Sequence, residues 1–165
     1  MAEPSNIIMT EEPTPVAPAR SCGSCSLCCK LLVIDELAKP PDTWCPHCKP
    51  GRGGCSIYAD RPPSCRLFRC GWLDSKGGVG DEWYPARSKM VLFNLPGPGF
   101  QVIVDPAFPL AWRSEPYYSQ LGAAARRSPV EIRIGFRGFV LNSDGTEREG
   151  RTAPDWDRDF PKPQD

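Results

Sequence analysis

The sequence has little histidine and no excess of charge of either sign. Its 165 residues include one histidine, and 20 Lys and Arg balance 20 Asp and Glu, which gives a formal net charge of +0. A neutral chain exerts no general attraction on nucleic acid or on an anionic membrane, so we expect neither as a partner. A single imidazole also argues against a hydrolytic metal site, because such sites use histidine or carboxylate ligands and keep one position open for water.

Long apolar runs are also lacking. Residues 1–20 carry acids where a signal peptide carries positive charge, and their longest apolar run, Ile7–Met9, is far too short for a membrane span. Their mixture of Pro, Glu, Ser and Thr predicts a disordered leader. We therefore expect a cytoplasmic protein, in a compartment that keeps thiols reduced.

Motifs of the common enzyme classes are absent from the sequence. It contains no Walker loop, no dinucleotide-binding GxGxxG after a strand, no HExxH and no GxSxG. The carboxylate pairs Asp35-Glu36 and Asp81-Glu82 are typical of solvated surface. The sequence therefore indicates no catalytic residues and favours a binding protein over an enzyme.

Cysteine, in contrast, is abundant and concentrated. All 9 cysteines fall between Cys22 and Cys70, and none follows in the C-terminal part of the chain. Disulfides, metal ligation and coincidence are the competing explanations. An odd number of closely spaced cysteines in a reducing compartment is most simply explained by metal, because disulfides would leave one thiol unpaired.

The first cysteines form a regular pattern, in which two residues separate Cys22 from Cys25 and Cys25 from Cys28, and Cys29 is adjacent. This spacing lets successive sulfurs converge on one ion. Side chains of adjacent residues normally diverge, so Cys28 and Cys29 either serve different ions, or one ligates while the other bridges or packs. The pattern favours two centres, since the 9 cysteines cover two four-sulfur sites with one left over.

The stretch Cys45-Pro46-His47-Cys48 has a rival interpretation as a disulfide oxidoreductase motif. The turn signal Lys49-Pro50-Gly51 argues against it, because it breaks the helix that such a motif needs. His47 is a candidate ligand, a hydrogen-bond donor to a ligand, or simply exposed. The opening C-x2-C-x2-C also repeats the start of a bacterial iron–sulfur run, which leaves an iron–sulfur cluster open.

Two segments of the sequence resemble the YkgJ-like cysteine-cluster family, whose domain is described as zinc- or iron-chelating. Residues 22–29 match that family's CxxCxxCC opening, and residues 54–70 match its C-x-I-Y-x-x-R-P-x-x-C-R-x-F-x-C close. The span from the first motif to the end of the second covers about a third of the chain. The resemblance leaves Cys48 as an extra cysteine. The metal ligands that it implies are Cys22, Cys25, Cys28, Cys29, Cys45, Cys55, Cys65 and Cys70.

The resemblance implies metal chelation, with zinc as the first expectation and iron or an iron–sulfur cluster as the alternative, since both metals accept four-cysteine sites. Thiolates would hold the metal in a mainly structural or carrier role. A related cluster occurs in flagellin lysine methylases, so the alternative extends to an iron–sulfur protein that supports a redox or protein-methylation reaction. We therefore also expect a protein partner, of unspecified identity and oligomeric state.

The residues around the cysteines fit this interpretation. Pro- and Gly-rich turns leave room only for short elements between residues 21 and 75, so this segment needs metal in order to fold. Arg66, Phe68, Arg69 and Trp72 form a small basic and aromatic set, but the neutral chain counts against nucleic-acid binding. The cations placed to offset the thiolate charge are Lys30, Lys49, Arg52, Arg61, Arg66 and Arg69.

Beyond residue 75 the sequence predicts regular secondary structure. The apolar runs 89–94 and 100–105 flank a Pro- and Gly-rich loop and predict a hairpin. Ser114 is a candidate cap for a helix that ends before Pro129. The apolar stripe of this helix is Tyr118, Leu121 and Ala125.

Three further runs complete the predicted fold. Residues 130–134 and 136–141 predict two strands, and the apolar run 30–34 predicts another, although a helical turn fits it as well. The fold class is therefore α+β: an irregular, metal-organised cysteine module (21–75), then a small antiparallel sheet with one helix (80–145). Residues 146–165 are acidic and contain proline, so we expect a frayed tail.

Overall fold

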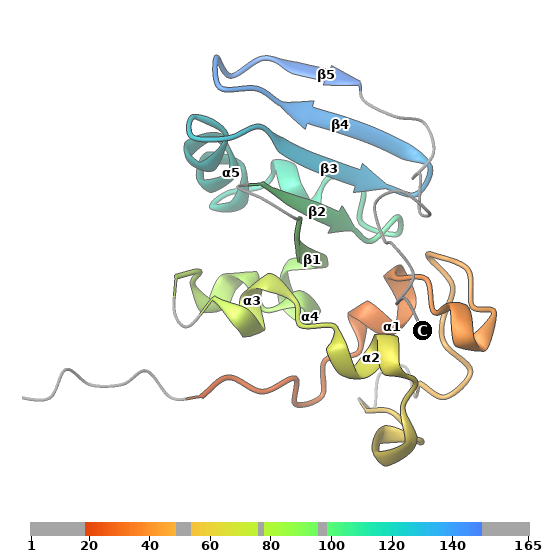
Figure 1. Ribbon diagram of the computed structural model, residues 1–165. Helices are drawn as coiled ribbons and strands as arrows, with labels where there is room; N and C mark the ends of the chain where they lie inside the picture. The colour runs from red at the N-terminus through yellow and green to blue at the C-terminus, as the bar shows by residue number, and fades with distance from the viewer. Residues whose placement is uncertain (1–18, 49–53, 76–77, 96–98, 150–165) are drawn as a thin grey trace, which may run out of the picture.

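The computed structural model describes residues 19–48, 54–75, 78–95 and 99–149 (Figure 1). The chain forms a five-stranded sheet with one nine-residue helix packed on it, preceded by a segment of short helices and turns. The predicted α+β class is confirmed.

Short helices dominate the described chain before the sheet. The turns that the sequence places between the cysteines limit the α-helices there to four or five residues. The α-helices are α1 (Leu27–Leu31), α2 (Pro63–Leu67), α3 (Gly71–Asp74) and α4 (Pro85–Ser88). The 3-10 helices are η1 (Asp35–Leu37), η2 (Tyr58–Asp60) and η3 (Asp81–Trp83).

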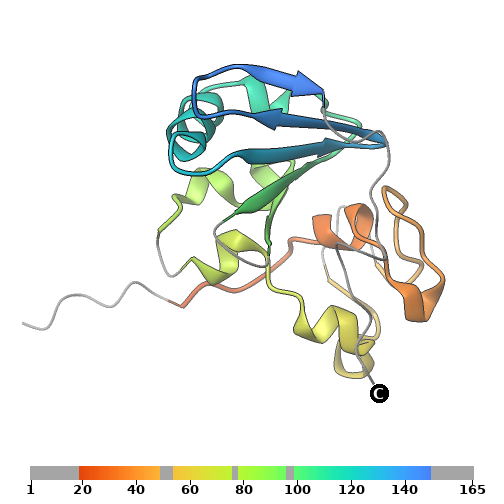
Figure 2. The same ribbon diagram turned by 45° about the horizontal axis from the view of Figure 1, so that its top comes forward.

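The sheet keeps its strands in chain order, with β1 at one edge and β5 at the other (Figure 1). The short helices gather beyond the β1 edge, and this arrangement remains clear when the molecule is turned (Figure 2). The elements of this half are β1 (Met90–Asn94), β2 (Phe100–Val104), η4 (Ala111–Arg113), α5 (Tyr117–Ala125), β3 (Val130–Ile134), β4 (Arg137–Leu141) and β5 (Glu147–Glu149).

The predicted hairpin is confirmed, whereas the predicted all-antiparallel sheet is not. β1 and β2 pair antiparallel, with Met90 opposite Val104. β2 and β3 run parallel, with Val102 opposite Ile132. The connection between them contains α5, and a crossover of this kind returns the chain to the end at which the previous strand began.

The expected frayed tail is wrong for its first residues. β5 pairs with β4, with Glu147 opposite Leu141. The Arg113 guanidinium donates to both carboxylate oxygens of Glu147, at 2.9 and 2.6 Å, and this bidentate pair fixes a segment of low strand propensity. Residues 150–165 of that tail, and residues 1–18 of the expected leader, lie outside the described residues.

The helix α5 ends before Pro129 as predicted, but its predicted cap is wrong. The Ser114 hydroxyl donates to the carbonyl of Ala111 at 2.6 Å, and the residue before the first helical turn is Pro116. Leu121 and Ala125 of the predicted stripe are buried. Tyr118 lies at the edge of that stripe, where its hydroxyl donates to Glu147 at 3.0 Å.

The apolar run 30–34 is not a strand. The helix α1 extends to Leu31, and only Ile34 makes an isolated bridge, to Lys39. Leu27 and Leu31 are four residues apart, so a helix places both on one face, where they are buried. Packing therefore selects the helical turn that the sequence left open.

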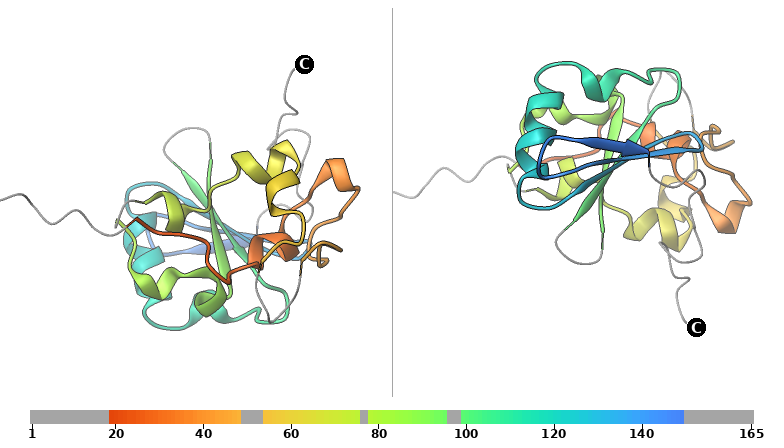
Figure 3. Two further views of the ribbon diagram at one scale, coloured as in Figure 1. Left: turned by 90° about the horizontal axis from the view of Figure 1, so that it is seen from below. Right: turned by 90° about the horizontal axis from the view of Figure 1, so that it is seen from above.

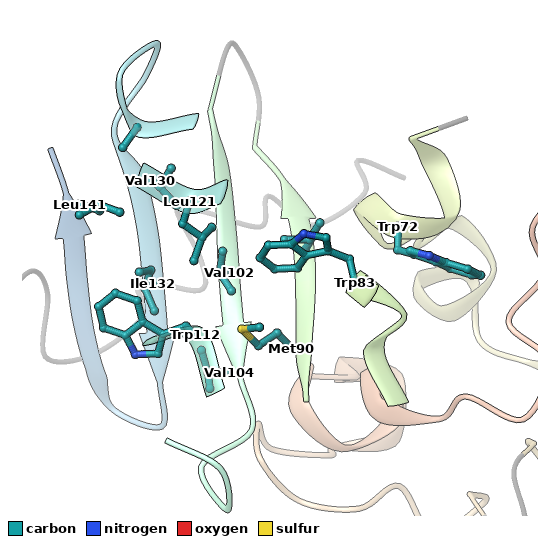
Figure 4. Close-up of a cluster of buried hydrophobic side chains, with 12 residues drawn as sticks. Trp72, Trp83, Met90, Val102, Val104, Trp112, Leu121, Val130, Ile132 and Leu141 are labelled. Atoms are coloured by element: carbon teal, nitrogen blue, oxygen red, sulfur yellow. The ribbon is translucent and has the colours of Figure 1, made fainter. Parts of the chain in front are cut away.

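Both faces of the β1–β2 hairpin are buried. On one face Met90, Val102 and Val104 pack with Trp112 and Leu121 in the main core (Figure 4). Side chains alternate between the two faces along a strand, so Val91 and Ile103 point away from that core, on the opposite face of the hairpin. Burial of each such side chain stabilises the fold by about 1.5–3 kcal/mol.

The second face of the hairpin joins the sheet to the cysteine segment. Val91 and Ile103 pack against Leu27 and Leu31 of α1. Seen from below, α1 and α2 lie to one side of β1, and α3, α4 and α5 lie to the other (Figure 3). The helix α1 therefore fixes Cys28 and Cys29 relative to the sheet.

Candidate metal centre

The cysteines surround one groove. All nine lie within the described residues and are free thiols. The groove has a volume of about 1140 Å³. Its lining also includes Phe68, which stacks on Phe93 of β1 with ring centroids 5.5 Å apart. Eight cysteines line it, namely Cys22, Cys25, Cys28, Cys29, Cys45, Cys55, Cys65 and Cys70.

Adjacent cysteines on α1 point into different surroundings. Cys28 packs with Leu27, Leu31 and Val91 in the cluster that joins α1 to the sheet. Cys29 instead packs with Ile34 and the cysteines of the following loops. Successive residues of a helix are turned by about 100°, which is the physical reason for this divergence.

The first cysteine group comprises Cys22, Cys25, Cys28 and Cys70. Cys25, Cys28 and Cys70 pack in one cluster, and the charges of Cys22 and Cys25 act on the thiols of Cys28 and Cys70. Burial raises the pKa of Cys25 and of Cys70. Backbone N–H groups oppose this: that of Leu27 at Cys25 and that of Leu73 at Cys70. Such N–H groups stabilise thiolates, the form that binds metal.

The second cysteine group comprises Cys29, Cys45, Cys48, Cys55 and Cys65. Cys45 and Cys48 are buried, and Cys29 and Cys65 pack against them. The backbone holds the group together: the N–H of Cys45 donates to the carbonyl of Cys29 (3.1 Å), and Cys48 forms a β-bridge with Cys55. The group therefore combines α1, the following loops and α2.

Within the second group, the surroundings of Cys29 favour ionisation of its thiol. A hydrogen bond from the Cys28 thiol lowers its pKa to about 6, and a second one from Cys48 and the charges of Lys39 and Arg61 act in the same direction. That hydrogen bond, together with burial, raises the pKa of Cys28. The hydrogen bond therefore favours the thiolate form at Cys29 and the protonated form at Cys28.

Cys48 occupies a different position from the other cysteines. It is buried, hydrogen-bonds Cys29 and Ser26, and is not among the residues that line the groove. Burial raises the pKa of its thiol. His47 is half-buried between Cys45 and Cys48, and its backbone carbonyl accepts a hydrogen bond from the N–H of Ser56 at 2.8 Å.

The cysteines suit a metal ion in their chemistry and in the way they are grouped, but not yet in their detailed arrangement. In the described ranges 19–48, 54–75, 78–95 and 99–149, no three Cys, His, Asp or Glu side chains are already arranged to hold one ion. The donor set is nevertheless that of a thiophilic metal, since the eight cysteines that line the groove all offer sulfur. Binding would require loss of thiol protons, and the hydrogen bond between Cys28 and Cys29 would then give way to bonds to the metal.

Several of the cations that we expected to offset the thiolate charge interact with other groups. Lys30 pairs with Asp105 at 2.6 Å, and Arg69 pairs with Asp74 at 3.2 Å. The Arg66 guanidinium donates to the carbonyls of Arg61 (2.7 Å) and Ala59 (3.0 Å). Lys49 and Arg52 lie outside the described residues.

Lys39 is a residue that the sequence did not single out. Its side chain is buried, and burial lowers its pKa, whereas the negative charges of Cys45 and Cys29 oppose this. No local pattern marks it, because its burial depends on the return of the chain after η1, where Ala38 adopts a left-handed conformation (φ 48°) and Lys39 bridges to Ile34.

No family model, no curated protein and no solved structure matches this chain. The resemblance to the YkgJ-like family therefore stays a prediction that rests on the quoted motifs. In the part of the chain that the structure describes, no helix has the length and apolar character needed to cross a bilayer.

Proposed function

We propose that this protein is a cytoplasmic metal-binding protein that holds zinc through two sets of thiolates. The observation that carries the proposal is the divergence of Cys28 and Cys29 from one short helix into two cysteine groups along a single groove. A protein that used its cysteines only for packing would have no reason to gather eight of them along one groove.

The first centre would use Cys22, Cys25, Cys28 and Cys70, and the second Cys29, Cys45, Cys55 and Cys65. We choose Cys55 over Cys48 because Cys55 lines the groove with the other seven and Cys48 does not. Cys48 then acts as a hydrogen-bond donor to the Cys29 sulfur. Metal-bound thiolates are commonly stabilised by donors of this kind.

The metal role in this proposal is structural or that of a carrier. Four thiolates fill the coordination sphere of zinc and leave no position for a reacting water, so we expect no hydrolytic turnover at these centres. The centres would tie α1, α2 and the start of α3 together, in a segment whose helices are too short to be stable alone. A protein partner would receive or sense the bound metal.

An iron–sulfur protein that supports a redox or protein-methylation reaction is the second candidate. The apolar wall around the cysteines supports it: Leu27 and Leu31 flank the first group, and Ile34 flanks the second. Apolar surroundings and N–H donors are means by which proteins set the potential of such clusters.

Anaerobic purification of the full chain, followed by elemental analysis and a visible spectrum, tests the proposal. Two zinc ions per chain and a colourless protein are expected. X-ray absorption should then report only sulfur neighbours, at about 2.3 Å. A brown protein containing iron and sulfide would favour the second candidate, and a chain that binds neither metal would overturn both.

A further inference from the structure

Lys39 is buried beside the second cysteine group although its side chain carries a charge. Only 4% of its surface is exposed. Its ammonium donates to the carbonyls of Lys30 and Pro40, both at 2.9 Å, and to that of Leu32. These carbonyls use all three N–H donors of the ammonium and hold it at the carboxyl end of α1, the helix that carries Cys29.

Within the described residues, Lys39 forms no ion pair with a carboxylate. Among the ion pairs of the described residues, Asp105 pairs with Lys30 at 2.6 Å and Asp42 pairs with Arg133 at 3.0 Å, and none involves Lys39. A lysine is almost never fully buried without an opposite charge nearby. The neighbours of Lys39 are instead cysteines: Ile34, which bridges to Lys39, packs with Cys45 and Cys48, and Cys29 packs against the same cluster.

We infer that Lys39 is the internal countercharge of a metal–thiolate centre in the second cysteine group. The inference rests on the proposed function. Four thiolates around a divalent ion carry a net charge of about −2, and an uncompensated negative charge in a buried site is strongly unfavourable. A fixed ammonium offsets that charge without entering the coordination sphere. Lys39 is therefore a positioning residue and not a ligand.

The inference explains two local features of the chain. The turn at Ala38 and the bridge from Ile34 to Lys39 return the chain to α1 and bring the lysine inside. The apolar residues Ile34 and Leu37, between α1 and this lysine in sequence, pack on the second cysteine group. The loop after α1 thus brings both an apolar cover and a cation to the same sulfurs.

The test compares Lys39→Gln with Lys39→Arg in the full chain. Both are made in a Cys22→Ser background, which removes a ligand of the first centre, so that zinc binding reports the second. Competition with a chromophoric zinc chelator gives the affinity. Loss of the charge in Lys39→Gln should weaken zinc binding by about 10- to 100-fold, the usual range for residues around a metal centre. Lys39→Arg keeps the charge and should stay within about threefold of the parent.

A double-mutant cycle separates charge from structure. Cys65→His replaces a thiolate by a neutral imidazole and lowers the charge of the centre from about −2 to about −1. If Lys39 acts through charge, the effect of Lys39→Gln should shrink to about 3- to 10-fold in that background. A purely structural contribution would leave the effect undiminished. Lys89→Gln, which removes a lysine whose ammonium lies 5.3 Å from the Phe108 ring, is the control and should change nothing.

Three results would overturn the inference while zinc binding itself stands. They are an equal loss of zinc affinity in Lys39→Gln and Lys39→Arg, an undiminished loss of affinity in the Cys65→His background, and an unchanged affinity in Lys39→Gln. A native chain that binds no zinc would overturn the proposed function and the inference together. The same experiment therefore distinguishes the two failures.

Discussion

Cys28 and Cys29 are neighbours on α1, yet their side chains lie in two different packing clusters, one against the sheet and one against the following loops. Their sulfurs nevertheless interact, since a hydrogen bond between them lowers the pKa of Cys29 and raises that of Cys28. One turn of helix thus divides the cysteines between two groups and keeps the groups in contact.

The first prediction concerns which cysteines are ligands. Cys48→Ser should keep both zinc ions, because Cys48 lies outside the groove lining and serine can still donate a hydrogen bond to Cys29. Cys55→Ser and Cys65→Ser should each lose one ion. Elemental analysis of the purified variants gives the metal-to-protein ratio. Loss of an ion in Cys48→Ser together with full occupancy in Cys55→Ser would assign the fourth ligand to Cys48.

The second prediction concerns metal removal. The helices of the cysteine segment are too short to persist alone, whereas the sheet has its own core around Trp112 and Val102. A strong chelator should therefore greatly increase amide hydrogen exchange in residues 22–70 and leave β1–β4 protected. Mass spectrometry of peptides from both regions measures this. Equal protection of residues 22–70 with and without chelator would show that metal does not organise the segment.

The third prediction tests the link between α1 and the sheet. Leu31 is 0% exposed and Leu67, also the last residue of a short helix, is 74% exposed. Leu31→Ala should lower the free energy of unfolding by about 2–5 kcal/mol, because it leaves a cavity against Val91 and Ile103. Leu67→Ala should change it by less than about 0.5 kcal/mol. Urea titrations of both variants provide the comparison, and similar losses would contradict this packing.

The fourth prediction concerns acid pH. Hydrogen bonds from Arg113, together with one from Tyr118, lower the pKa of Glu147 from its usual 4.5. A carboxyl whose pKa is lower in the folded state stabilises the fold above its unfolded pKa, and this contribution is lost as the pH falls through the folded value. The stability difference between the native chain and Glu147→Gln should therefore be largest above pH 4.5 and disappear in more acidic solution.

Glu149→Gln is the matched control for this pair. Glu149 lies on the same strand and meets Arg137 at 3.5 Å, but both side chains are exposed, so the pair contributes little. Urea titrations from pH 3 to pH 7, a range of about four units around the usual carboxyl pKa, compare the three proteins. A pH-independent difference for Glu147→Gln would show that the bidentate pair does not fix β5.

Local sequence patterns predicted much of the sheet. The hairpin of β1 and β2 and the strands β3 and β4 are β-branched or alternating runs between strong turn signals, and such runs depend little on distant contacts. The strand β5 could not be predicted in this way. Its Glu-Arg-Glu sequence has no apolar pattern, and it is held by Arg113, which is 34 residues away in the chain.

Spacing alone predicted that the cysteines gather in one region and that Cys28 and Cys29 diverge, because both follow from the geometry of short segments. Tertiary structure decided which sulfurs lie together, since Cys70 joins Cys25 and Cys65 joins Cys45 only when α2 and α3 fold back on α1. It also decided that Lys39 is buried and that Lys30 forms an ion pair with Asp105. The sequence gives the charge of each residue directly. The burial and the partner of that residue depend on contacts between segments far apart in the chain, and local sequence patterns do not predict such contacts.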